Sequence, residues 1–197
     1  AAELEAQGRQ ASLVFASNVL AHVADTRDFV RGIGRLLADD GTAIVEAPYL
    51  GDLIEHLEFD TIYHEHFQYY TVGTAIKALA SGGLDVVDVE LVPTHGGSIR
   101  LWARPSELGA ERSPAVGKVL ADEAKAGLDS VEGHAGFARE VSRIRNDLMR
   151  FLIDAADAGK TVVGYGAPGK GNTLLNYCGI RPDLLAYKIG RASCRER

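Results

Sequence analysis

An alternation of apolar runs with a helix-like segment constrains the fold of this chain more than any other feature. Residues 11–20, ASLVFASNVL, are typical of a buried strand, and residues 42–48, TAIVEAP, are typical of another. Between them the spacing predicts a helix, from an N-cap at Asp25 or Thr26 to a stop at Gly41. A strand, helix, strand unit predicts two parallel strands joined by a right-handed crossover.

The rest of the chain continues this α/β pattern. Residues 71–83 predict a helix that ends at glycines, and residues 84–93 and 96–105 alternate like two strands of an antiparallel ribbon. Residues 136–159 predict a long amphipathic helix. Residues 160–179 predict a strand, a glycine-rich loop and the start of a helix. We therefore expect a second α/β unit to begin near residue 160.

Composition and charge argue against several classes of partner. The net charge of −6 and the pI near 5.5 do not favour binding to nucleic acids or anionic membranes, which attract clustered Lys and Arg. The apolar runs are far shorter than the ~20 residues of a membrane span. Cys178 and Cys194 are too few for a four-cysteine zinc site or a disulfide framework. We expect a cytoplasmic globular protein with no nucleic-acid or membrane partner.

The most unusual stretch is residues 59–71, FDTIYHEHFQYYT, which places Tyr63, His64, Glu65 and His66 side by side. Imidazole and carboxylate groups together are typical of acid–base catalysis or of a metal site. A structural cluster at a domain edge is the third interpretation, because clustered polar residues indicate function only statistically.

Four stretches occur in an order that resembles the sugar C-methyltransferase family. They are NVLAHV, the segment EAPYLGDLIEHLEFDTIYHEHFQYYT, HGGSIRLWA and GYGAPGKGNTLLNYCGI. Together with the regions between them, the resemblance covers residues 1–188. Members of that family methylate a carbon of nucleotide-linked deoxyketosugars that are used in antibiotic biosynthesis. The order of two parallel strands followed by an antiparallel pair is also that of the second half of a class I methyltransferase sheet, which binds ligands beyond the carboxyl ends of its strands.

The resemblance implies a division of the chain. We expect residues 1–105 to be the C-terminal part of an S-adenosylmethionine-dependent methyltransferase domain and residues 106–188 to be the start of a Rossmann-like C-terminal domain. Residues 189–197, IGRASCRER, resemble a translated sequencing adapter and are expected to be an artefact. The resemblance places a zinc-binding module and the glycine-rich cofactor loop before Ala1, so we expect zinc only in that module. We also expect this chain alone to be inactive.

The resemblance also implies catalytic roles. Carbon methylation requires removal of a proton next to a ketone and stabilisation of the enolate that forms. Tyr63, Glu65 and His66 match the active-site tyrosine, glutamate and histidine of the family. We assign His66 as the base, Glu65 to orient the imidazole or contact the sugar, and Tyr63 to donate a hydrogen bond to an oxygen. His22 matches a second histidine and is the alternative base.

Binding roles are assigned to five further residues. Asn18 is expected to contact S-adenosylmethionine. Gly96, Gly97 and Ser98 would let the backbone approach a nucleoside-diphosphate deoxyketosugar, although the same residues also suit a plain hairpin turn. Lys170 is assigned to the phosphates of that substrate.

The loop that contains Lys170 fits two phosphate-binding patterns. Gly164, Gly166 and Gly169 match GxGxxG, while Gly164, Gly169 and Lys170 match GxxxxGK. Gly171 stands where a nucleoside triphosphatase needs Ser or Thr to bind magnesium, which argues against that class. A free helix N-terminus beside a lysine still favours a diphosphate, and a tight turn between strand and helix is the alternative.

Other functions stay open on the sequence. The HExxH metal pattern fails because residue 68 is glutamine, so we expect no metal ion. The chain could instead be a noncatalytic module that binds a nucleotide-sugar, or a relative that methylates oxygen or nitrogen. The last two acceptors need no enolate, so exchange of a substrate C–H proton separates these cases from carbon methylation.

Overall fold

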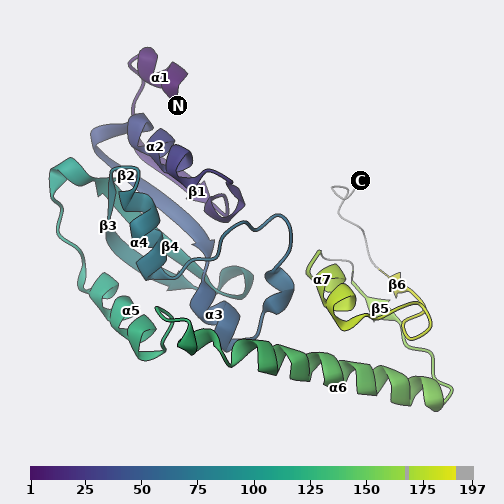
Figure 1. Cartoon of the computed structure of the whole chain (residues 1–197). Coiled ribbons are helices and arrows are strands. Elements are labelled where there is room, and N and C mark those ends of the chain that lie inside the picture. The colour runs from purple at the N-terminus through teal and green to yellow at the C-terminus, as the bar shows by residue number, and fades with distance from the viewer. Residues whose placement is uncertain (167–168, 190–197) are drawn as a thin grey trace. The chain divides into compact units, whose positions relative to one another are not determined.

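The computed structural model describes residues 1–166 and 169–189 (Figure 1). Of the expected artefact at residues 189–197, only Ile189 is among the described residues. The described residues form two compact units. The first unit is Ala1–His56 with Glu65–His134, and the second is Leu57–His64 with the residues from Ala135 onward. The domain boundary that we expect at residue 105 stays a prediction.

A four-stranded sheet forms the centre of the first unit. Its strands are β1 (Ala11–Ser17), β2 (Leu37–Pro48), β3 (Leu84–Val92) and β4 (Ser98–Pro105), in the order β1-β2-β4-β3. β1 and β2 are parallel, and β4 pairs antiparallel with both β2 and β3. This confirms the expected α/β fold, with two parallel strands followed by an antiparallel pair.

The core lies on the sheet face that α2 and α4 cover (Figure 1). Val30 of α2, Leu79 of α4 and the strand residues Val45, Ile99 and Leu101 have no exposed surface. The helical elements of this unit are α1 (Ala2–Ala6), η1 (Leu20–His22), α2 (Thr26–Leu36), α3 (Leu50–Glu55), α4 (Val72–Ala80), η3 (Thr94–Gly96), η4 (Ser106–Leu108), α5 (Pro114–Lys125) and η5 (Glu132–His134).

The start of α2 follows the sequence signal, but its end does not. The Asp25 side chain is the N-cap and accepts a hydrogen bond of 2.9 Å from the Asp28 backbone N–H. The expected stop at Gly41 is wrong, because the chain becomes extended at Leu37, which is buried in the core. Gly41 lies inside β2, where a Cβ atom would come within 2.9 Å of the Ala38 carbonyl oxygen.

The expectation that residues 11–20 form a buried strand is wrong for one of its faces. β1 is an edge strand, and among the described residues it pairs only with β2. Leu13 is 58% exposed and Phe15 is 59% exposed, while Ala16 on the opposite face is buried. Within the part of the chain that the structure describes, the helices of the core cover the Ala16 side, and Leu13 and Phe15 lie exposed on the other face.

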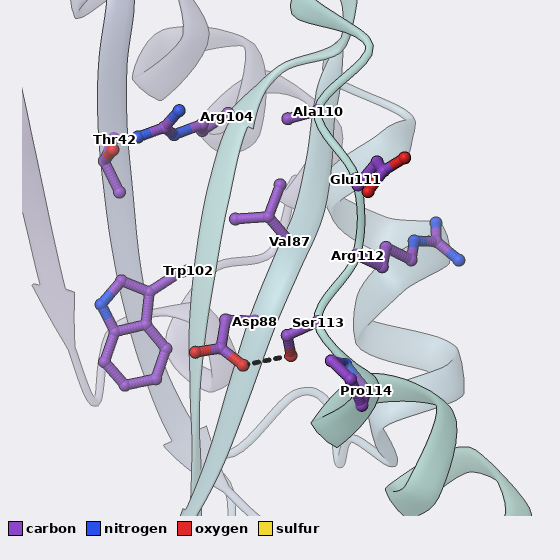
Figure 2. A pocket seen from close by; sticks show the side chains of 10 residues that line it. All are labelled: Thr42, Val87, Asp88, Trp102, Arg104, Ala110, Glu111, Arg112, Ser113 and Pro114. Atoms are coloured by element: carbon purple, nitrogen blue, oxygen red, sulfur yellow. Dashed lines mark hydrogen bonds between the residues drawn. The ribbon is translucent and has the colours of Figure 1, made fainter.

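A bulge interrupts the pairing of β3 with β4. The register shifts between Val86 and Asp88, so that Val87 is the extra residue. The segment before α5 is attached at this bulge: the Ser113 N–H donates to the Val87 carbonyl oxygen at 2.7 Å, and the Ser113 hydroxyl donates to the Asp88 carboxylate (Figure 2). The bulge therefore fixes where the chain crosses from β4 to α5.

The second unit is mainly helical. Its elements are η2 (Phe59–Thr61), α6 (Phe137–Asp157), β5 (Gly164–Tyr165), α7 (Gly169–Cys178) and β6 (Lys188–Ile189), with β5 and β6 parallel. α7 packs against α6 and η2, and the rings of Phe59 and Tyr177 lie 5.0 Å apart between centroids.

The long helix expected near residues 136–159 is confirmed as α6, which buries Val141 and Leu152 and leaves Phe151 exposed. Among the described residues, the strand expected after residue 160 is limited to the two residues of β5, which pair with the two residues of β6. Residues 167 and 168 of the glycine-rich loop lie outside the described residues. Among the helices of the described ranges, none combines the length and the apolar composition that crossing a membrane requires.

Candidate active site

The first unit brings together His66, the predicted base, and His22, the predicted alternative base. His22 ends η1, and His66 follows in the segment before α4. Their ring centroids are 4.8 Å apart with planes tilted by 59°, and the Tyr69 ring stands edge-on to His66 at 6.0 Å. His22 and His66 therefore belong to one cluster and need not be alternatives.

A set of hydrogen bonds holds the His66 segment against η1 and α2. The Phe67 N–H donates to the Ala21 carbonyl oxygen at 2.9 Å. The side-chain oxygen of Gln68 accepts from the Thr26 hydroxyl at 2.8 Å and from the Tyr70 hydroxyl. Gln68, which breaks the HExxH metal pattern, thus connects the segment that carries His66 to the chain that follows His22.

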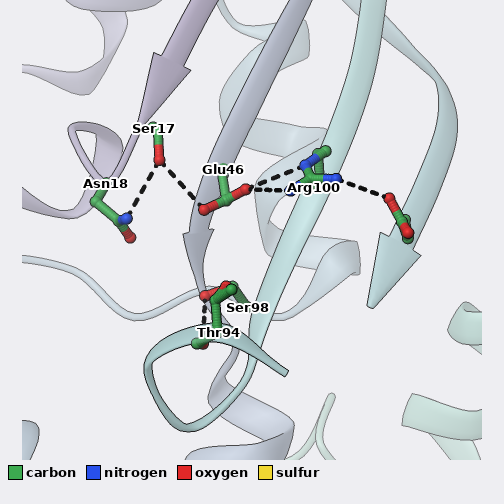
Figure 3. Close-up of polar contacts among 7 residues, drawn as sticks. Ser17, Asn18, Glu46, Thr94, Ser98 and Arg100 are labelled. Carbon is green, nitrogen blue, oxygen red and sulfur yellow. Dashed lines mark hydrogen bonds and ion pairs between the residues drawn. The ribbon is translucent and has the colours of Figure 1, made fainter. Parts of the chain in front are cut away.

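A second polar cluster lies at the carboxyl end of β1 and β2 (Figure 3). Asn18 directly follows β1 with a positive φ of 53°, and its backbone N–H donates to the Glu46 carbonyl oxygen at 2.9 Å. The Asn18 side-chain amide donates to the Ser17 hydroxyl, which donates to the Glu46 carboxylate, both at 3.2 Å. The side chain of Asn18 is thereby oriented by its neighbours.

Arg100 completes this cluster. Its Nε and Nη2 atoms donate to the buried Glu46 carboxylate at 3.1 and 2.9 Å, and its Nη1 donates to Glu90 at 3.0 Å. These bonds raise the pKa of Arg100, with the Glu46 hydrogen bond as the largest cause. Strand register places Ser17, Glu46, Arg100 and Glu90 in one row across all four strands. No sequence motif predicted this row, although a glutamate inside the apolar run TAIVEAP was a signal for it.

The glycine segment before β4 is a tight turn. His95, Gly96 and Gly97 have φ angles of 56°, 90° and 122° in succession, a backbone region that favours glycine. Ser98 is fully buried, and its hydroxyl donates to the Thr94 carbonyl oxygen at 3.0 Å. Ser98 thus stabilises the turn.

Asp52 of α3 packs directly against this turn. A Cβ atom on Gly97 would overlap the Asp52 side chain, and the Tyr49 N–H donates to the Gly97 carbonyl oxygen at 3.0 Å. Burial raises the pKa of the Asp52 carboxyl group, an effect that the nearby His56 partly offsets and Glu55 adds to. A carboxyl group with a raised pKa therefore lies beside the expected substrate-binding glycines.

Glu123 of α5 anchors the start of α4. This buried carboxylate accepts hydrogen bonds from the Val72 and Gly73 N–H groups at 2.5 and 3.0 Å. Burial raises the pKa of the Tyr49 hydroxyl, and so do the charge and the hydrogen bond of Glu123. Glu123 thus joins α5, α4 and the chain after β2 in one contact.

Two of the expected site residues lie in the second unit. The ring of Tyr63 contacts that of His64 edge-on at 6.2 Å, and the Lys170 Nζ lies 3.9 Å from a carboxylate oxygen of Glu58. The first unit contains Asn18, His22, Glu65, His66, Gly96, Gly97 and Ser98. Glu65 is exposed on the surface of its unit. Within the described residues no group of three His, Cys, Asp or Glu side chains has the arrangement of a metal site.

Comparison with known proteins decides the family. A model of the C-methyltransferase C-terminal domain matches residues 93–196, which is more than half of the chain. The chain belongs to the C-methyltransferase family. This family member is 41% identical over 170 residues to the C-methyltransferase NovU of Streptomyces niveus, a match that covers 86% of the chain. The family expected from the sequence motifs is confirmed.

This C-methyltransferase family member spans 40% of the length of NovU. Its similarity to a solved structure, the crystal structure of LaPhzM, is low, with a TM-score of 0.37 and 17% identity over 49% of this chain and 31% of that one.

Proposed function

We propose that this chain is part of an enzyme that transfers a methyl group to a carbon of a nucleotide-linked deoxyketosugar. The observation that carries the proposal is the His22–His66 pair, held at 4.8 Å between ring centroids within a motif that resembles sugar C-methyltransferases. An imidazole ordinarily titrates near neutral pH and can remove a proton next to a ketone. The family membership supports the methyl transfer, and the motif supports the sugar acceptor.

We assign the proton transfer to the two histidines together. His66 takes the proton from the carbon next to the ketone, which leaves an enolate on the sugar. The neighbouring His22 ring then offers a second position for that proton. This assignment keeps His66 as the base and gives His22 a role beside it, supported by their proximity.

The other residues of the motif are proposed to position the substrate. Glu65 is assigned to the sugar or to the His66 ring, and Tyr63 to an oxygen of the enolate. The turn at Gly96, Gly97 and Ser98 is proposed to border the sugar, because the absence of side chains at its glycines lets a ligand approach the backbone.

Lys170 is proposed to bind the diphosphate. It lies in the first turn of α7, and an ammonium group there adds to the positive end of the helix dipole. The Glu58 carboxylate, 3.9 Å from the Lys170 Nζ, would hold the ammonium group in place before the substrate binds.

S-adenosylmethionine is the cofactor that methyltransferases generally use, and when bound it supplies an electrophilic methyl group. The polar cluster of Asn18, Ser17 and Glu46 lies at the carboxyl ends of two parallel strands, where folds of this class bind their ligands. Its amide, hydroxyl and carboxylate groups suit the polar groups of such a cofactor. We assign Asn18 to contact the cofactor, with Ser17 and Glu46 orienting its amide.

The test measures deuterium exchange at the substrate carbon, using a protein of NovU length that carries this sequence. His66→Asn is expected to reduce exchange and methyl transfer together by about 100-fold or more, because general-base catalysis is removed. The matched control is His134→Asn, because His134 lies at the end of η5, forms a hydrogen bond of 3.2 Å with the Leu128 carbonyl oxygen and has no assigned role.

Two outcomes would overturn the proposal. Methyl transfer to oxygen or nitrogen without C–H exchange would indicate another acceptor, which needs no enolate. Binding of a nucleotide-sugar with neither exchange nor transfer in the unmutated protein would indicate a noncatalytic binding module.

A further inference from the structure

The side chain of Gln68 lies between the two segments that carry His22 and His66. Its amide nitrogen donates to the Val23 carbonyl oxygen at 3.5 Å, and its amide oxygen accepts from the Thr26 hydroxyl at 2.8 Å. Val23 directly follows His22, and Thr26 is the first residue of α2. Gln68 therefore contacts the chain immediately after His22 and again at the start of α2.

The amide of Gln68 has a defined orientation. Its oxygen accepts a second hydrogen bond, from the hydroxyl of the buried Tyr70. Burial raises the pKa of this hydroxyl, and a hydrogen bond with Thr26 offsets the rise only in part, so Tyr70 stays protonated at neutral pH and donates. Because two donors occupy the lone pairs of the amide oxygen, the amide nitrogen is left to face Val23.

The backbone is fixed on both sides of Gln68 as well. Before it, the Phe67 N–H donates to the Ala21 carbonyl oxygen at 2.9 Å, and after it, the Leu50 N–H donates to the Tyr70 carbonyl oxygen at 2.8 Å. All of these residues belong to the first unit, as do both histidines. The arrangement consists of contacts inside that unit and involves no open surface.

The ring of His66 depends on these contacts for its position. Among the described residues, 66–69 form neither a helix nor a strand, so no regular backbone hydrogen bonds set the direction of their side chains. Proton transfer needs the reacting atoms at about 3 to 3.5 Å, and a displacement of about 1 Å can slow a reaction by about 100-fold. Loosening this stretch should therefore affect the rate of reaction more than the binding of substrate.

We propose that Gln68 is a positioning residue for the proton transfer assigned to His66 and His22. By holding the stretch that follows His66 to the stretch that follows His22, its amide keeps the two rings at 4.8 Å between centroids. Gln68 acts through the rings and takes no part in the proton transfer itself. This role rests on the proposed function, because the reaction that it supports is the one proposed for the histidines.

The first test compares the kinetics of C–H exchange in a protein of NovU length that carries this sequence. Gln68→Met keeps the length of the side chain and removes its hydrogen bonds. We expect kcat for exchange to fall about tenfold or more, while KM changes by less than about twofold. The control is Ser113→Ala, which removes a hydrogen bond to Asp88 at the β3 bulge. It should lower the melting temperature and leave kcat unchanged.

Variants of Thr26 separate the hydrogen bond from the shape of the side chain. Thr26→Val keeps the branched shape without the hydroxyl, and we expect it to lower kcat by about threefold or more. Thr26→Ser keeps the hydroxyl and should stay within about twofold of the unmutated protein. Equal losses in the two variants would overturn the proposal, and so would a raised KM with an unchanged kcat in Gln68→Met.

A spectroscopic measurement separates this role from the reaction. In the unmutated protein with isotope-labelled histidine, we expect a nuclear Overhauser cross-peak between ring protons of His22 and His66, because the rings are in contact. Gln68→Met should weaken or abolish it, and an unchanged cross-peak in that variant overturns the proposal. If the unmutated protein exchanges no C–H proton, the proposed function fails, while a cross-peak that Gln68→Met abolishes still supports the positioning of the rings by Gln68.

Discussion

At the scale of single residues, Gly97 is constrained in two independent ways. Its φ of 122° is unfavourable for other residues, and its missing side chain leaves the space that Asp52 occupies. We expect Gly97→Ala to reduce the free energy of unfolding by about 2 to 4 kcal/mol, measured by urea denaturation.

The matched control for this change is Gly117→Ala in α5. Gly117 has no neighbour within 4 Å of an added Cβ, and it lies inside a helix. Alanine should stabilise the protein there by about 0.5 to 1 kcal/mol. Equal effects of the two substitutions would contradict the role given to Gly97.

Asp52 should make stability depend on pH. Because burial raises its pKa in the folded state, the folded protein holds the Asp52 proton more tightly than the unfolded chain does. Stability contributed by this group is therefore present at low pH and lost as the pH rises from the ordinary carboxyl pKa through the folded value. Asp52→Asn should melt at a higher temperature than the parent at pH 7, and melting curves at a series of pH values should show this difference closing below about pH 4. A difference that widens in acid would argue against a raised pKa.

Site residues were predictable where neighbouring residues in the sequence formed a motif. The YHEH run and the NVLAHV stretch singled out His66 and His22, but no spacing rule shows that their rings meet, because the strand order and the Gln68 contacts bring them together. The partners of Glu46 were not predictable for the same reason, since Arg100 reaches it only after β4 inserts between β2 and β3.

At the scale of elements, Glu123 links α5 to the start of α4 by two hydrogen bonds. Glu123→Ala would leave the buried Val72 N–H and the partly buried Gly73 N–H without their acceptor, so we expect a loss of about 3 kcal/mol in the free energy of unfolding. Glu123→Gln keeps one acceptor oxygen and should lose less.

The control is Asp122→Ala, one residue earlier on α5 and exposed. It should change the free energy of unfolding by less than about 0.5 kcal/mol. Chemical denaturation of all three variants checks the order, and a loss for Asp122→Ala as large as that for Glu123→Ala would show that α5 is sensitive as a whole.

Element starts were more predictable than element ends. Asp25 caps α2 because the capping bond lies within three residues along the chain. The end of α2 is set by the burial of Leu37 in the core, which no local pattern reveals. The pairing partner of β5 is likewise not local, because β6 lies more than twenty residues further along the chain.

At the scale of the whole molecule, the two faces of β1 differ in their surroundings. Phe15→Lys should change the free energy of unfolding by less than about 0.5 kcal/mol, because the phenyl ring is 59% exposed. Ala16→Lys should lower the free energy of unfolding by about 3 kcal/mol or more, because the side chain of residue 16 points into the core. Thermal melts of both variants measure the contrast, and equal losses would mean that both faces are covered in solution.

The fold class was predictable because it rests on patterns repeated over many residues. The strand, helix, strand unit and the following ribbon specify an α/β sheet with both parallel and antiparallel pairs. The open face was not predictable, because the apolar run ASLVFAS is typical of a strand covered on both sides. The sequence of a strand shows which of its side chains are apolar, but it does not show whether another element packs against them.

The second unit is built from two separate stretches of the chain, which affects how C-terminal units can be exchanged between related proteins. Residues 57–64 belong with the residues after 134, and η2 packs on α7 although the chain returns to the first unit at Glu65. Removal of the residues after 134 would leave residues 57–64 without α7, on which η2 packs, and would expose Phe59. Exchange of the C-terminal unit between relatives therefore requires exchange of an inserted loop as well, and that loop contains the first half of the YHEH run.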